Sequence, residues 1–345
     1  MHVNRVEIDR RLSRVVSERL LPAVYRSLVP LTVRRFDVPG EPISVTEALA
    51  AEYAPSKVGE RWGPAWGTTW FELAADVPDE WAGEIVEGVV DLGFDRDVPG
   101  FAVEGLVYRP DGTAIKGLHP FNRWFPVDSQ ATSVRVLVEA AANPSIVFRL
   151  PTQAGDLETA SIDTLYTLRQ ADLGVVDVTV RELVADLDVL SQLADQLPDD
   201  EPRAAQIRAG LSEALDAVSL SDISGTAARA REILAPLLTR PAHASAHQIS
   251  AVGHAHIDSA WLWPLRETVR KVARTCANVT QLMDDHPDLV FVMSQAQHLA
   301  WLEDSHPDLF ARVEKKIAAV QFVPVGGMWS KPTPTCQVAR RWPGS

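Results

Sequence analysis

The residues best suited to chemistry lie together in the segment 253–264. This segment holds two imidazoles, one carboxylate and two indoles, at His254, His256, Asp258, Trp261 and Trp263. An apolar run over 249–253 precedes them and a charged helical pattern begins at residue 265, so we expect a strand, a turn and a helix. Side chains alternate along a strand, so His256 and Asp258 would share one face. A neutral imidazole beside a carboxylate suits a divalent ion, and zinc accepts both.

The elements after residue 247 alternate between strand and helix. Strands are predicted at 249–253, 289–294 and 321–327, with a helix over 265–285 and another that ends near residue 304. This alternation indicates parallel strands in a sheet or barrel. Ligands bind at the carboxyl ends of strands in such folds, which is where His256 and Asp258 fall.

The part of the chain before residue 247 shows a different pattern of predicted secondary structure. Residues 4–30 carry apolar side chains near the helical period, so a helix is predicted there. Short strands with turn signals between them predict a β-sandwich, with strands at 68–73, 101–108 and 133–139. Leucine-rich stripes on either side of a Pro-Asp-Asp-Glu-Pro break predict a helical hairpin over 181–238.

Composition narrows the choice of partners and compartment. With 345 residues, roughly two domains are expected. The net charge of −13 argues against nucleic acid and anionic membranes as partners, because their phosphates would be repelled. The first residues lack the apolar run of a secretory signal, and two cysteines make no disulfide framework. We therefore expect a cytoplasmic protein in which Cys276 is a small buried apolar residue.

At this point the residues match a known family. The segment 254–268, His-Ala-His-Ile-Asp-Ser-Ala-Trp-Leu-Trp-Pro-Leu-Arg-Glu-Thr, resembles the opening motif of glycoside hydrolase family 38, the class II α-mannosidases. Ser-Gln-Ala-Gln at 294–297 and Gly-Gly-Met-Trp at 326–329 are similar to the next two strand ends of that family. Residues 70–73, 104–108 and 111–112 resemble the β-sandwich of its cytosolic and vacuolar branch.

The resemblance implies a site as well as a fold. It implies a seven-stranded β/α barrel with one zinc ion, cobalt being the other candidate metal, and retaining hydrolysis of mannose-containing oligosaccharides. His256 and Asp258 would be the first two metal ligands and Trp261 the floor under the bound mannose. His254 would lie behind the ligands or in the core, and Trp263 would pack. The full-length form is a possible homo-oligomer.

The expected fold class is α+β and multidomain, ending in an incomplete (β/α)7 barrel. The parts are a helical lead-in at 1–35, a β-sandwich at 36–150, a helical hairpin or linker at 151–247, the start of the barrel at 248–329 and a tail at 330–345.

The tail departs from the family pattern after Trp329. The family continues with Val-Glu-x-Asp-x-Asn, whereas this chain continues with Ser-Lys-Pro-Thr-Pro-Thr and ends at Ser345. Permitted codons for residues 330–345, read one base out of register, encode Val-Glu-Ala-Asp-Thr-Asn and then Leu-Pro-Gly-Gly-Glu. We therefore expect a frame-shifted tail on the front portion of a longer mannosidase. This portion would be inactive alone, because the family's nucleophile and acid/base lie further on. Sequencing the gene across codon 330 tests this.

Two other functions stay open at this stage. One is a non-catalytic carbohydrate-binding or assembly module, although Trp62, Trp66, Trp70 and Trp81 are predicted to be core rather than a sugar-binding surface. The other is a different metal hydrolase, such as a deacetylase, which needs more histidines near the later strand ends. His298 is the candidate for that role.

Overall fold

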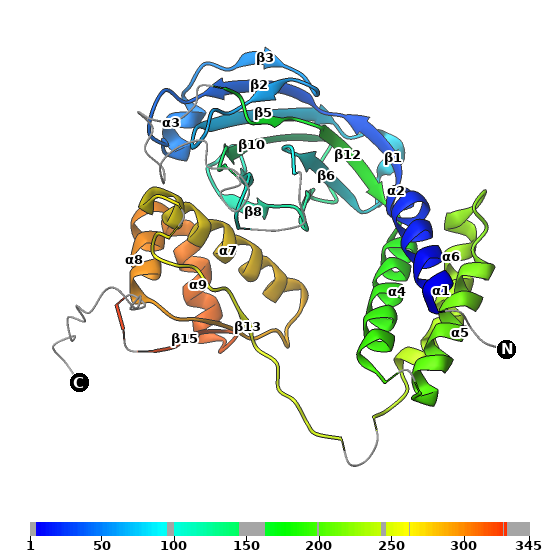
Figure 1. Cartoon of the computed structure of the whole chain (residues 1–345). Helices are drawn as coiled ribbons and strands as arrows, with labels where there is room; N and C mark the ends of the chain where they lie inside the picture. The colour runs from blue at the N-terminus through cyan, green and yellow to red at the C-terminus, as the bar shows by residue number, and fades with distance from the viewer. Residues whose placement is uncertain are drawn as a thin grey trace. The chain divides into compact units, whose positions relative to one another are not determined.

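The computed structural model describes residues 5–94, 100–144, 163–198, 200–242, 246–261, 263–326 and 328–329 (Figure 1). The chain divides into two compact units. Unit 1 comprises Met1–Val29, Gly83–Val86 and Gly174–Ile249, and unit 2 comprises Pro30–Ala82, Glu87–Leu173 and Ser250–Ser345. Among the described residues, none of the helices has the length and apolarity needed to cross a membrane.

Unit 1 begins with helix and turns to strand earlier than the sequence suggested. α1 (Arg5–Val15), a π-helical segment (Val16–Leu20) and α2 (Leu21–Ala23) follow one another. The predicted helix is wrong for the residues after 24, where β1 (Tyr25–Pro30) runs instead. Pro30 explains part of the change, because it cannot continue a helix and disfavours helical backbone at the residue before it.

The predicted helical hairpin is in fact a group of three helices within the described part of unit 1. These are α4 (Val178–Gln196), α5 (Pro202–Ala217) and α6 (Ile223–Leu238). The side chains of Asp177 and Asp222 accept hydrogen bonds from backbone N–H groups in the first turns of α4 and α6, which fixes where these helices start. The leucine-rich stripes of the three helices pack together with Leu12 and Leu20 in one apolar core.

The β-sandwich is present, with more strands than predicted. Its strands are β2 (Thr32–Asp37), β3 (Ala54–Ser56), β4 (Arg61–Trp62), β5 (Thr68–Asp76), β6 (Val86–Asp91), β7 (Glu104–Tyr108), β8 (Ala114–Leu118), β9 (Trp124–Pro126), β10 (Ser133–Ala141), β11 (Tyr166–Thr167) and β12 (Gln170–Val176), with short helices α3 (Val45–Leu49) and η2 (Asp79–Trp81) between strands. The sheet orders are β3-β2-β5-β10-β7-β8, β1-β12-β6-β9 and β11-β4. The strands predicted at 68–73, 101–108 and 133–139 are confirmed as β5, β7 and β10. β11 and β12 lie outside the bounds 36–150.

The last part of unit 2 is a parallel sheet with helical connections. β13 (Gly253–His254), β14 (Phe291–Met293) and β15 (Phe322–Pro324) are parallel and neighbour one another in that order. α7 (Leu265–Asp285) confirms the predicted helix, and α8 (Ala296–Ser305) and α9 (Pro307–Ala318) follow β14. The strand predicted at 249–253 is wrong for residues 249–252, which have no regular structure, and only Gly253 lies in β13. Ile249 is 87% exposed and Val252 is 56% exposed, so no other surface covers this apolar run.

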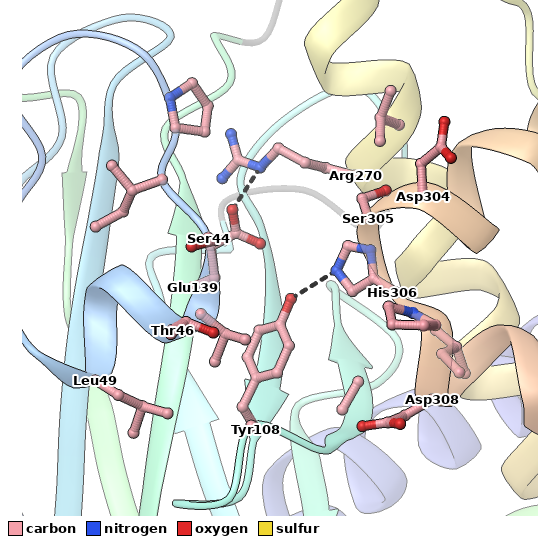
Figure 2. A pocket seen from close by; sticks show the side chains of 18 of the residues that line it. Ser44, Thr46, Leu49, Tyr108, Glu139, Arg270, Asp304, Ser305, His306 and Asp308 are labelled. Carbon is pink, nitrogen blue, oxygen red and sulfur yellow. Dashed lines mark hydrogen bonds and ion pairs between the residues drawn. The ribbon is translucent and has the colours of Figure 1, made fainter.

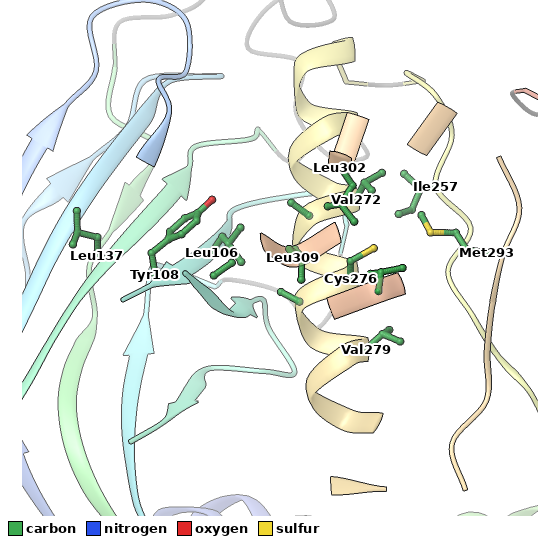
Figure 3. Packing of buried hydrophobic residues seen from close by; sticks show 14 of the residues in the cluster. Leu106, Tyr108, Leu137, Ile257, Val272, Cys276, Val279, Met293, Leu302 and Leu309 are labelled. Atoms are coloured by element: carbon green, nitrogen blue, oxygen red, sulfur yellow. The ribbon is translucent and has the colours of Figure 1, made fainter. Parts of the chain in front are cut away.

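α7 packs on the sandwich and on the parallel strands at once. One apolar cluster joins Leu106 and Tyr108 of β7 to Val272 and Cys276 of α7 and continues to the strands and helices beyond (Figure 3). Cys276 is fully buried, as predicted. Gly117 permits the close approach of β8 to α7, since a Cβ there would lie 3.0 Å from the Cβ of Arg274.

A buried ion network reinforces the contact between α7 and the sandwich. Its members are Glu104, Glu139 and Asn143 of the sandwich with Glu267, Arg270, Lys271 and Arg274 of α7. The shared carboxylate of Glu104 lies 3.0 Å from Lys271 Nζ and 2.7 Å from Arg274 Nη1. Burial alone would raise the pKa of Glu267, but the charges of Arg274, Arg270 and Lys271 outweigh it and lower that pKa well below its ordinary value. Both Glu104 and Glu267 are therefore ionised inside the protein.

Candidate functional site

His256 and Asp258 meet in the loop that follows β13. The Nε2 atom of His256 lies 3.2 Å from Oδ1 of Asp258, and the two side chains are 58% and 25% exposed. The backbone there is irregular rather than extended, so the pairing comes from the loop and not from strand alternation. In a tetrahedral zinc site with bonds of about 2.0–2.2 Å, neighbouring donor atoms are roughly 3.2–3.6 Å apart. The two donors thus have the spacing of two corners of such a site.

Thr268, in the first turn of α7, holds the loop in place. Its Oγ1 accepts hydrogen bonds from the backbone N–H of Ala260 at 2.9 Å and from Trp263 Nε1 at 3.0 Å. The same hydroxyl donates to the carbonyl oxygen of Asp258 at 3.4 Å. Thr268 is fully buried, and Ala260 has a φ of 68°, which a residue with a Cβ seldom adopts. The sequence placed Thr268 in the family motif but gave no sign of this role.

Three side chains fasten the loop to the end of β14. The amide of Gln295 donates to the carbonyl oxygen of Ile257 at 2.7 Å and accepts from Ser259 Oγ at 2.9 Å. His298 Nε2 lies 3.2 Å from the same hydroxyl, and because the single proton of Ser259 goes to Gln295, His298 donates. Gln295 has a φ of 126°, a strained backbone for a residue other than glycine. The sequence placed Gln295 in a strand-end motif and Ser259 in the family motif without giving either a role, and it named His298 only as a candidate for a different metal hydrolase.

His254 has a partner on the neighbouring strand. Its Nδ1 donates to the carbonyl oxygen of Val292 at 2.9 Å, and Val292 is also the residue that faces His254 where β13 pairs with β14. The residue is exposed rather than part of the core. Its position behind the His256–Asp258 pair therefore stays a prediction.

An aromatic group of three rings lies beside the loop. Trp261 is 56% exposed, and its ring meets Phe101 edge-to-face at 5.9 Å and Trp263 at 6.0 Å. Trp263 is 7% exposed, so it packs as predicted. Phe101, from the sandwich, was not foreseen, since it is far from the motif in sequence. The edge contacts hold the exposed indole of Trp261 in one orientation.

His256 also lines a cavity of about 400 Å³. α7 contributes Lys271 and Arg274 to its wall, and the sandwich contributes Glu104 and His119. Burial lowers the pKa of His119, so this imidazole is neutral at neutral pH. Charged and neutral polar groups from both parts of unit 2 thus converge beside the candidate ligands.

His256 and Asp258 supply two donor atoms for a divalent cation, which is fewer than a complete metal site has. The imidazole and carboxylate are the right donors at the right spacing. Within the described ranges, however, no group of three or more His, Cys, Asp or Glu side chains is arranged to hold a metal ion.

The alternative functions receive little support from the structure. Trp62, Trp66, Trp70 and Trp81 are 1–7% exposed, so they are core residues and offer no platform for a sugar. His298 is 1% exposed and bonds Ser259. A burial-lowered pKa of about 4 keeps His298 neutral.

Both parts of unit 2 match known protein families. Residues 246–336 match the glycosyl hydrolases family 38 N-terminal domain, and residues 29–174 match the alpha-mannosidase jelly roll domain. The chain belongs to glycosyl hydrolase family 38.

Named relatives extend the match over most of the chain. Alpha-mannosidase 2C1 of Homo sapiens is 32% identical over 310 residues, which are 87% of this chain and 28% of that protein. Alpha-mannosidase G of Dictyostelium discoideum is 26% identical over 292 residues, or 84% of this chain and 26% of the relative. The alpha-mannosidase of Saccharomyces cerevisiae is 30% identical over 295 residues, or 81% and 26%. The chain therefore spans little more than a quarter of the length of these relatives.

Proposed function

We propose that this chain is the amino-terminal part of a cytoplasmic, zinc-dependent α-mannosidase that hydrolyses terminal α-mannosides with retention of configuration. The parallel strands β13, β14 and β15 would open the (β/α)7 barrel over residues 248–329. The observation that carries the proposal is the approach of His256 Nε2 to Asp258 Oδ1 at 3.2 Å, at the carboxyl end of β13. Relatives named as α-mannosidases support it.

Each residue has a separate task in this proposal. His256 and Asp258 hold the cation, and Thr268 and Gln295 hold the backbone that presents them. A bound zinc ion would supply positive charge that orients sugar hydroxyls and stabilises negative charge. The exposed face of Trp261 lies under the sugar ring, and Phe101 and Trp263 fix its tilt. We place the hydrolysis itself in the longer protein rather than in these residues alone, since the matched residues make up only 28% and 26% of two of these relatives.

Metal binding by the chain tests the proposal directly. Zn²⁺ or Co²⁺ is titrated into the protein and followed by calorimetry and, for cobalt, by its visible absorption. We expect His256→Ala and Asp258→Ala each to weaken binding by at least about tenfold, because each removes a donor atom. His286→Ala, which removes an exposed imidazole at the end of α7, serves as the matched control and leaves binding unchanged.

Hydrolysis of an aryl α-mannoside by the longer protein is the second arm. The same two substitutions lower kcat/KM, and His286→Ala does not. Metal affinity that is the same in all three variants would exclude His256 and Asp258 as ligands, and unchanged hydrolysis in Asp258→Ala would reject the proposed site.

A further inference from the structure

A second and larger cavity in unit 2 has the chemistry of a small-molecule site. Its volume is about 610 Å³, within the range of roughly 300–1,000 Å³ of ligand pockets. It lies where α3, the β7–β8 turn, the first turns of α7 and the α8–α9 junction meet (Figure 2). None of its lining residues also lines the cavity beside His256, so the two are separate.

A buried ion pair forms one wall of this cavity. Arg270 Nε lies 2.9 Å from Glu139 Oε1, and the two side chains are 9% and 7% exposed. Arg270 Nη1 lies 3.3 Å from Glu267. Its other terminal nitrogen, Nη2, is buried and has no hydrogen-bond partner in the part of the chain that the structure describes. An unpaired buried donor is costly, so an oxygen atom of a ligand would stabilise this arrangement.

Tyr108 and His306 supply further polar groups. The phenol oxygen of Tyr108 lies 3.0 Å from Nε2 of His306 (Figure 2), and the two ring planes differ by 18°. Burial raises the pKa of Tyr108 and lowers that of His306, so both groups are neutral at neutral pH. With Tyr108 donating, the imidazole proton lies on Nδ1, which is buried and without a partner among the described residues.

The charges around the cavity select the class of ligand. Its lining includes five carboxylates against two guanidinium groups: Glu41, Asp111, Glu139, Asp304 and Asp308 against Arg266 and Arg270. This excess of negative charge opposes an anion. Donors, acceptors and the apolar side chains of Ile43, Val45 and Leu49 suit a neutral molecule with many hydroxyl groups and apolar C–H faces.

We propose that this cavity binds a neutral saccharide unit of the mannoside substrate or product, apart from the site at His256. The choice of a mannoside rests on the proposed function. The cavity would hold a second part of a branched glycan or a released sugar, with Arg270 and His306 donating to hydroxyl oxygens and Glu139 accepting.

The test uses methyl α-mannoside, titrated into the full 345-residue chain and followed by calorimetry or ligand-detected NMR. Thr46→Trp fills the cavity from an exposed position on α3, and we expect it to weaken binding by at least about tenfold. Thr132→Trp makes the same change at an exposed position outside the cavity and leaves binding unaltered. Tyr108→Phe removes the phenol hydroxyl and weakens binding by about two- to tenfold. Tyr53→Phe, which removes a buried hydroxyl bonded to the Ala48 carbonyl, does not.

The outcomes separate this proposal from the proposed function. Binding that survives in His256→Ala and is lost in Thr46→Trp supports the second site, whatever the metal titration shows. Binding that is lost in His256→Ala and insensitive to Thr46→Trp leaves the proposed function intact and overturns the second site. The second site is also overturned if no binding of methyl α-mannoside is detected. It is overturned as well if inorganic phosphate binds more tightly than the mannoside and Thr46→Trp weakens that phosphate binding.

Discussion

At the scale of single residues, the candidate ligands depend on a hydroxyl that is not itself a ligand. Thr268 Oγ1 joins the loop at Ala260 and Trp263 and reaches the carbonyl of Asp258, so it holds both sides of the turn that carries the candidate ligands. The positive φ of Ala260 requires such support, because a left-handed residue with a Cβ costs of order 1–3 kcal/mol.

Thr268→Val should therefore change metal binding as well as stability. Valine keeps the shape and removes the hydroxyl, so about 1–3 kcal/mol of unfolding free energy is lost and the affinity for Zn²⁺ falls. Thr280→Val is the control, since Thr280 is equally buried on α7 and its hydroxyl donates to the Cys276 carbonyl. Thr280→Val should lower the stability and leave the affinity for Zn²⁺ unchanged. Equal metal affinity in the two variants, measured by calorimetry, would show that Thr268 does not position the loop.

The buried imidazole of His298 makes stability depend on pH. Burial lowers its pKa from the ordinary 6.5 to about 4, so between these values the unfolded chain binds a proton that the folded chain does not. The fold therefore loses stability as the pH falls from 6.5 toward 4, by about 1–3 kcal/mol from this group. In His298→Gln the loss over this window should be smaller, whereas in His286→Gln, at an exposed position, it should match the parent. Urea unfolding at pH 7 and pH 4.5 gives the comparison, and parallel pH profiles for parent and His298→Gln would contradict the argument.

At the scale of elements, the sequence predicted those whose evidence is local. The charged helical pattern that begins at residue 265 predicted α7 over 265–285, as observed. The three strands of the sandwich that were predicted carry their own β-branched pattern. β13 is shorter than its apolar run suggested, because a run of apolar residues does not specify whether another surface covers it.

The contacts that position the site come from residues far apart in the chain. Glu267 is buried, and its burial depends on Arg270 and Arg274 and on Asn143 of the sandwich. Phe101 reaches Trp261 from 160 positions away in the chain. A local period or motif carries no information on contacts between residues so far apart in the chain. The candidate ligands could therefore be predicted from the sequence, whereas the residues that position them could not.

The ion network makes α7 sensitive to the loss of one charge. Arg274→Met leaves the buried carboxylates of Glu104 and Glu267 with less compensation, and we expect about 3–5 kcal/mol of destabilisation. Lys316→Met removes the partner of Asp284, which is 63% exposed, and should cost less than about 1 kcal/mol. Chemical unfolding of both variants measures the difference. Similar losses would mean that the network contributes no more than a surface pair.

At the scale of the whole molecule, α7, α8 and α9 belong with the sandwich despite a long separation in sequence. Residues 246–252 connect them to unit 1, are exposed throughout and have no regular structure. One apolar cluster and the ion network join residues before this segment to residues after it, all within unit 2. A cut in the segment would therefore break the chain without breaking the core.

Limited proteolysis tests whether α7, α8 and α9 form one folded unit with the sandwich. Elastase, which prefers small apolar residues, should cleave within 246–252 and give two pieces on a denaturing gel that elute together from a sizing column under native conditions. Association persists because separation would expose Val272 and Cys276 of α7 and leave Glu104 without its cations. In Arg274→Met the nicked pieces should separate at a lower urea concentration than in Lys316→Met. Separation of the parent pieces without denaturant would mean that the sandwich and the parallel-sheet part are independent folding units.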